Sequence, residues 1–86
     1  MKIIRTKGIE SILPIKISVS KARWKEIQIR LFSLGCRWSY SGEYIVEAYE
    51  PYLFIDKHKH IRCSIDKNLF DEHAYKEIPE YKLLWK

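Results

Sequence analysis

The sequence predicts one α+β domain, residues 1–86, with a single helix packed on an antiparallel sheet of four to five strands in the order β-α-β-β-β-β. Three observations predict this fold. Apolar residues alternate in positions 13–19, recur at helical spacing in 21–34, and fall in short extended segments after residue 36. A chain of 86 residues has room for one modest core, and with only 3 Gly and 3 Pro no flexible linker divides it.

The first strand is expected in the second half of residues 9–19. Four apolar side chains share one face there (Leu13, Ile15, Ile17 and Val19), while Pro14, Lys16 and Ser18 share the other. Because proline has no amide hydrogen to donate, the strand should begin near Pro14 or lie at a sheet edge.

The helix is expected over residues 21–34. Ser20 is a suitable N-cap, and Gly35 supplies the left-handed residue that ends many helices. One apolar stripe runs along the helix (Trp24, Ile27, Leu31 and Leu34). Ile29 lies almost opposite this stripe, so it is either a tolerated surface residue or part of a partner surface.

Two hairpins are expected after the helix. The first joins residues 37–40 to 43–48 through the turn pair Ser41-Gly42, and the second joins 52–56 to 60–65 through the loop 57–59. In the second hairpin Ile61, Cys63 and Ile65 should face inward. A short helical turn near 66–73, a short strand at 77–79 and a segment at 81–85 that either packs or frays complete the pattern.

The positive charge is unevenly distributed. The net charge is +5, but residues 1–37 contribute 9 − 2 = +7 and residues 38–86 contribute 7 − 9 = −2. Clustered basic charge attracts phosphate or an acidic partner surface. No apolar run reaches the roughly 20 residues that span a bilayer, so no membrane partner is expected. Two cysteines are too few for a disulfide framework, which favours a cytoplasmic protein.

The stretch DKHKHIRC, residues 56–63, resembles a metal-ligand set at first sight. On a regular strand, however, His60 and Cys63 face opposite sides, and Cys63 is in phase with Ile61 and Ile65. We therefore expect no metal site and no cofactor.

An enzymatic alternative would use a Cys–His pair. Cys36 follows the helix C-terminus, whose negative end disfavours a thiolate, and His73 has no local signature of a catalytic base. No phosphate-binding loop or nucleophile elbow is present. We therefore expect no catalytic residues.

Basic and aromatic side chains occur together beside the hairpins, a combination that suits single-stranded RNA. Trp38 and Tyr40 either stack on bases or pack beneath the helix, and for Trp38 packing is the favoured interpretation. The side chains predicted to contact RNA or a protein partner are Lys21, Lys25, Arg30, Arg37, Lys57, Lys59 and Arg62.

The patterns Leu31-x-x-Leu34-Gly35-x-x-Trp38 and Tyr52-Leu53-x-Ile55-Asp56 resemble a recurring type of small phage-encoded protein, over roughly residues 20–80. The resemblance implies an accessory or counter-defence role, in a group that includes inhibitors of endoribonuclease toxins such as ToxN. It implies no residue roles, because its motifs are structural.

These observations together predict a non-enzymatic phage protein, acting in the cytoplasm of an infected bacterial host. It would bind and inhibit a host or defence component, such as a toxin or nuclease, with RNA in the interface. Two alternatives remain open: a module or homodimer that binds protein alone, through Ile29 and a sheet edge, and a small Cys/His enzyme.

Overall fold

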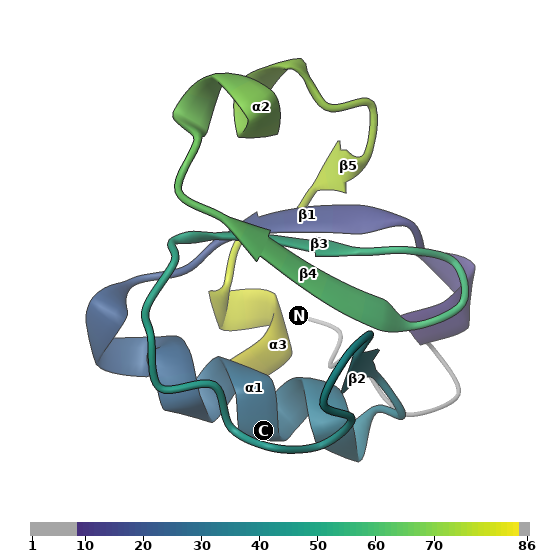
Figure 1. Ribbon diagram of the computed structural model, residues 1–86. Helices are drawn as coiled ribbons and strands as arrows, with labels where there is room; N and C mark the ends of the chain where they lie inside the picture. The colour runs from purple at the N-terminus through teal and green to yellow at the C-terminus, as the bar shows by residue number, and fades with distance from the viewer. Residues whose placement is uncertain (1–8, 85–86) are drawn as a thin grey trace.

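The computed structural model describes residues 9–84 and has an α+β fold, as predicted (Figure 1). Five strands form one sheet in the order β2-β4-β3-β1-β5, with α1 and α3 on one face and α2 above the other. The elements are β1 (Ile15–Ser18), α1 (Trp24–Ser33), β2 (Arg37–Trp38), β3 (Tyr52–Ile55), β4 (His60–Ser64), α2 (Lys67–Glu72), β5 (Lys76–Glu77) and α3 (Tyr81–Leu84).

The expectation of a purely antiparallel sheet is wrong. The central pairs β1–β3 and β3–β4 are antiparallel, but β5 pairs parallel to β1 and β2 pairs parallel to β4. Both edge strands reach their partners through crossovers rather than tight turns. A parallel pair requires a crossover, which local alternation of apolar residues does not reveal.

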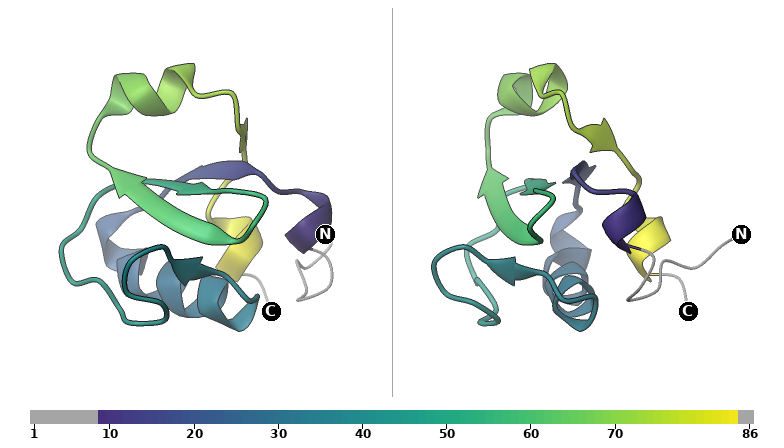
Figure 2. Two further views of the ribbon diagram at one scale, coloured as in Figure 1. Left: turned by 45° about the vertical axis from the view of Figure 1, so that its right-hand side comes forward. Right: turned by 90° about the vertical axis from the view of Figure 1, so that its right-hand side faces the viewer.

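The predicted first hairpin is also wrong. Only a bridge between Trp38 and Gly42 closes the turn, and residues 43–51 form no strand. The chain instead crosses beside the N-terminal half of α1 before it enters β3 (Figure 2). Tyr40, one of the residues interpreted as stacking or packing, is 99% exposed, whereas Trp38 is buried as favoured.

Gln28 explains this path. Its side chain is fully buried, and its Oε1 accepts hydrogen bonds from the Val46 amide at 2.7 Å and from the Trp38 indole at 3.1 Å. Its Nε2 donates to the carbonyl oxygens of Trp24 and Val46, at 3.2 and 3.0 Å. A buried polar group must be paired, so Gln28 holds the backbone of residue 46 against the helix instead of in a sheet ladder.

The helix stripe is confirmed, since Trp24, Ile27, Leu31 and Leu34 are all buried. Gly35, with φ at +91°, ends the helix as predicted.

The helix start differs from the prediction. A 3₁₀ turn, Lys21–Arg23, precedes α1, and Ser20 forms no cap with its side chain. The amide and hydroxyl of Ser20 instead donate to the Glu80 carboxylate, both at 3.0 Å. An acceptor 60 residues away in the sequence has therefore replaced the local cap.

The second hairpin is confirmed, with Ile55 opposite Ile61 and the loop 57–59 at its tip. Ile61 is fully buried, but Cys63 is only half-buried and Ile65 is 74% exposed, so the inward placement of Ile65 is wrong. The strand ends at Ser64, and the chain then turns away from the core toward α2.

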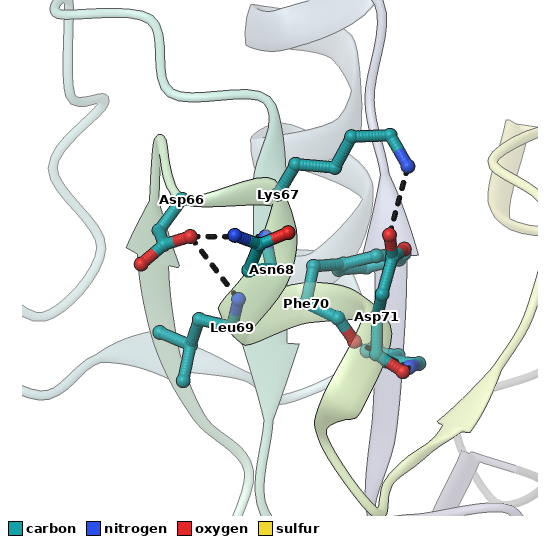
Figure 3. Close-up of polar contacts among 7 residues, drawn as sticks. Asp66, Lys67, Asn68, Leu69, Phe70 and Asp71 are labelled. Atoms are coloured by element: carbon teal, nitrogen blue, oxygen red, sulfur yellow. Dashed lines mark hydrogen bonds and ion pairs between the residues drawn. The ribbon is translucent and has the colours of Figure 1, made fainter.

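The short helix α2 begins at a true N-cap (Figure 3). The Asp66 carboxylate accepts hydrogen bonds from the amides of Asn68 and Leu69, at 2.9 and 3.2 Å. Phe70 is the buried residue of this helix and faces the sheet. At the C-terminal end, α3 buries Leu83 against α1; of the predicted segment 81–85, residue 85 lies outside the described residues.

Replacing Gln28 with alanine is expected to destabilise the protein by about 2–4 kcal/mol, because the Val46 amide and the Trp38 indole lose their partners and a cavity opens. Urea unfolding followed by circular dichroism measures this change. Ile29→Ala, on the exposed face of the same helix, is the control and should stay within about 0.5 kcal/mol of the wild type. Equal effects of the two substitutions would contradict the role of Gln28.

Candidate functional site

The two faces of the sheet present different side chains. Strand register places Lys16 beside Phe54 and Phe54 beside Arg62, so these three side chains lie on the face opposite α1. Arg37 pairs with His60 on the same face, toward the β2 edge. We call this the outer face. It contrasts with the inner face, where the hydrophobic core lies.

Lys16 fixes the segment that covers half of the outer face. Its side chain is buried, although the sequence predicted it on a polar face. The ammonium donates to the carbonyl oxygens of Phe70, Asp71 (3.4 Å) and His73 (3.1 Å), at the end of α2. It also lies 4.7 Å from the centre of the Phe70 ring. An ammonium is tolerated in a buried position when carbonyl dipoles replace its water.

A groove of 430 Å³ lies between this covering segment and β4. That volume falls in the range of about 300–1,000 Å³ in which ligand sites occur. Side chains of the outer face line it on one side, and α2 with the residues after it lines the other. The lining residues are Phe54, Asp56, His60, Arg62, Cys63, Ser64, Leu69, His73 and Tyr75.

Three rings of the groove lie in mutual contact. The His73 ring is 4.7 Å from the Phe54 ring and 4.2 Å from the Tyr75 ring, centre to centre. His73 and Tyr75 are half-buried, so parts of their rings remain open to the groove. We call these three residues the aromatic wall. Its position is held by a hydrogen bond from the Tyr75 amide to His73 Nδ1 at 3.3 Å, besides the Lys16 contact.

Asp56 shapes the loop at the end of the groove. Its Oδ1 accepts hydrogen bonds from the amides of His58 and His60, at 2.8 and 3.0 Å. Burial works against ionisation of this carboxyl, but these amides and the two imidazoles beside it hold its pKa below the usual value. Oδ2 lies 3.7 Å from His60 Nδ1. Asp56 is therefore both a turn former and an anionic group within the groove.

Three of the seven predicted contact residues already have partners within the protein. Lys25 pairs with Glu47 at 3.2 Å. Lys59 pairs with Glu10 at 2.7 Å, and its side chain lies against Gly35 at the C-terminal end of α1. Arg30 Nε donates to the carbonyl oxygen of Leu83 at 2.7 Å, which joins α1 to α3.

The other four, Lys21, Arg37, Lys57 and Arg62, are exposed and form no ion pair within residues 9–84. Arg37, Lys57 and Arg62 are carried by β2, the β3–β4 loop and β4, which meet where the Arg37 amide donates to the Lys59 carbonyl at 3.0 Å. We call these three the hairpin surface. Lys21 precedes the opposite end of α1, so the predicted residues do not form one continuous surface (Figure 1).

The candidate Cys–His pair is separated by the sheet. Cys36 belongs to the inner core, and burial raises the pKa of its thiol to about 11. Burial and the neighbouring Glu50 raise the pKa of Cys63 to about 12. His73 belongs to the outer face. Within residues 9–84, no three His, Cys, Asp or Glu side chains converge as a metal-ligand set.

The sequence did not single out the groove. Phe54, His73 and Tyr75 are separated in the chain, and their contact depends on the crossover that brings residues 66–77 back over the sheet. One signal was available, since strand 52–55 is apolar at every position and therefore indicates burial on both faces. That pattern implies that a second layer covers the outer face of the sheet. A groove can form at the edge of such a layer.

No family model, no curated protein and no solved structure matches this chain. Among the described residues, no helix has the length and apolar character needed to cross a membrane.

Replacing Lys16 with methionine should loosen α2 and the aromatic wall. The carbonyl groups at the end of α2 would lose their donor, at a cost of about 1–3 kcal/mol. Hydrogen exchange should then speed up in residues 66–76 more than in α1. Lys67→Met in the same helix is the control, because the Lys67–Asp71 pair (2.8 Å) is exposed to water and should contribute little. Uniform protection in both variants would contradict the docking role of Lys16.

Proposed function

We propose that this protein is a non-enzymatic binding protein that blocks a host or defence component containing RNA, such as a toxin or nuclease, and that the hairpin surface contacts single-stranded RNA. The observation that carries the proposal is the gathering of Arg37, Lys57 and Arg62 on one side of the molecule, each exposed and without an ion-pair partner among residues 9–84. Such side chains are free to bind phosphate.

The geometry of these cations suits a single strand better than a duplex. They lie around a short loop and a two-residue edge strand, next to a groove lined by aromatic rings. Proteins that bind single strands combine a positively charged track for the backbone with aromatic side chains for the bases. A duplex buries its bases and would leave the groove unused.

The phage and counter-defence part of the proposal is supported by the sequence pattern. The residues of that pattern are structural in this fold: Leu31 and Leu34 are buried, Gly35 ends the helix, and Trp38 donates to Gln28. Because these residues stabilise the fold, the charged loops are available to contact a partner. The expected setting is the cytoplasm of an infected bacterial cell.

The alternatives have weaker support. A homodimer through Ile29 and a sheet edge would find edge strands of only two residues each, β2 and β5, although Ile29 itself is 55% exposed. A Cys/His enzyme would need Cys36 and His73 together, but they lie on opposite faces of the sheet.

Binding of a short unstructured oligoribonucleotide should weaken steeply with added salt. With three phosphate contacts, the slope of log affinity against log salt should be about −2, since each contact on a single strand contributes about −0.7. Arg37→Ala/Lys57→Ala should reduce the magnitude of the slope by about 1.4. Fluorescence anisotropy across a salt series measures both values.

Lys21→Ala/Lys25→Ala is the matched control, because it removes the same charge from the other end of α1. It should leave the slope nearly unchanged. A slope near zero for the wild type, or equal losses in the two double variants, would refute the hairpin surface as the RNA contact.

A further inference from the structure

We propose that the groove receives one unpaired base of the bound RNA, stacked against the aromatic wall, while Arg62 holds an adjacent phosphate. This inference rests on the proposed function and specifies which part of the strand each surface contacts. It assigns a role to Phe54, His73 and Tyr75, which the hairpin surface does not use.

The aromatic wall offers the face of a single ring for stacking, because the His73 and Tyr75 rings meet edge to face at 72° and the Phe54 and His73 rings are tilted by 42°. Its rings are fixed by one another, with centre-to-centre distances of 4.7 Å between Phe54 and His73 and 4.2 Å between His73 and Tyr75. Phe54 is almost fully buried and forms the base of the wall, whereas His73 and Tyr75 are half-buried and keep part of their surface toward the groove. A prearranged ring loses little conformational entropy when a base stacks on it.

The opposite side of the groove supplies charge and hydrogen-bonding groups. Arg62 lies next to Phe54 across the β3–β4 ladder and is exposed, so its guanidinium is available to phosphate beside the wall. Asp56 Oδ1 is occupied by two amides, whereas the one polar partner of Oδ2 among the described residues is the His60 ring, with Nδ1 at 3.7 Å. It offers an acceptor for the edge of a base. A purely apolar ligand would leave these groups without partners.

The groove is also continuous with the hairpin surface. Arg62 belongs to both, and His60, which lines the groove, is paired in register with Arg37. A strand whose phosphates follow Lys57 and Arg37 can therefore deliver a base past Arg62 without crossing an uncharged region. Tyr40 is the competing platform, since it is 99% exposed and close to Arg37 in the chain, but it does not line this groove and contacts no other ring among residues 9–84.

The test compares an intact oligoribonucleotide with an abasic chain of the same length and the same phosphates. The wild type should bind the intact strand about tenfold more tightly, because stacking adds to phosphate contacts. Tyr75→Ala should bring the ratio of the two affinities toward one, while Tyr75→Phe should preserve it, because no hydrogen bond within residues 9–84 uses the Tyr75 hydroxyl. Tyr40→Ala is the matched control and should keep the wild-type ratio.

A second measurement needs no substitution. In the unmodified protein, the intact strand should shift the ring-proton NMR signals of His73 and Tyr75, and the abasic chain should not, because only a stacked base adds a ring current. Equal affinities for the two strands with a normal salt slope would overturn the groove assignment and leave the proposed function standing. Loss of the ratio in Tyr40→Ala instead of Tyr75→Ala would also overturn it. Salt-independent or undetectable binding of both strands would refute the proposed function itself.

Discussion

The structure depends most on the contact between the Lys16 ammonium and the carbonyl groups at the end of α2. A cation in a buried strand is unfavourable unless polar atoms replace its hydration, and here backbone oxygens do so without a carboxylate partner. The contact selects which segment covers the outer face, because α2 has only six residues and one buried side chain, Phe70. The groove lies between this covering segment and β4, with Leu69 of the segment and Arg62 of β4 both in its lining.

The same physical rule acts on the inner face through Gln28. Its amide pairs with both the backbone N–H and the carbonyl oxygen of Val46, so an irregular crossover can pack beside α1 without a sheet ladder. The Trp24 indole donates a further hydrogen bond to the Val46 carbonyl oxygen, at 2.7 Å. Two irregular segments of the fold are thus held by polar side chains from regular elements: Gln28 and Trp24 hold the crossover at Val46, and Lys16 holds the end of α2 and the residues that follow it.

The parts of the fold that could be predicted from the sequence are those set by local pattern. The helix stripe, the glycine that ends the helix and the hairpin around residues 57–59 follow from spacing and turn chemistry, and all three are present. The strand pairing of β2 and β5, the replaced cap at Ser20 and the path of residues 43–51 follow from contacts between distant residues. Polar side chains such as Lys16 and Gln28 resemble surface residues in the sequence, because most of their partners are backbone atoms that no pattern marks. The groove was missed for the same reason.

The distribution of charge shows why the candidate surface could be identified only from the ion pairs of the folded protein. Counting charged residues along the sequence does not show which cations are paired. The first 37 residues carry a net charge of +7. In the folded protein, however, several of these cations form ion pairs with acidic residues from later in the chain, as in Lys25–Glu47 and Arg23–Glu80. Lys59 is itself neutralised by Glu10 from the basic half. The cations left unpaired beside the sheet come from both halves of the chain, Arg37 from one and Lys57 and Arg62 from the other. Because Arg62 also borders the aromatic wall, the proposed phosphate contact and the proposed base stacking would meet at one residue. Long-range charge would bring a nucleic acid to this side of the molecule, and the short-range fit of a ring in the groove would set which part of it stays bound.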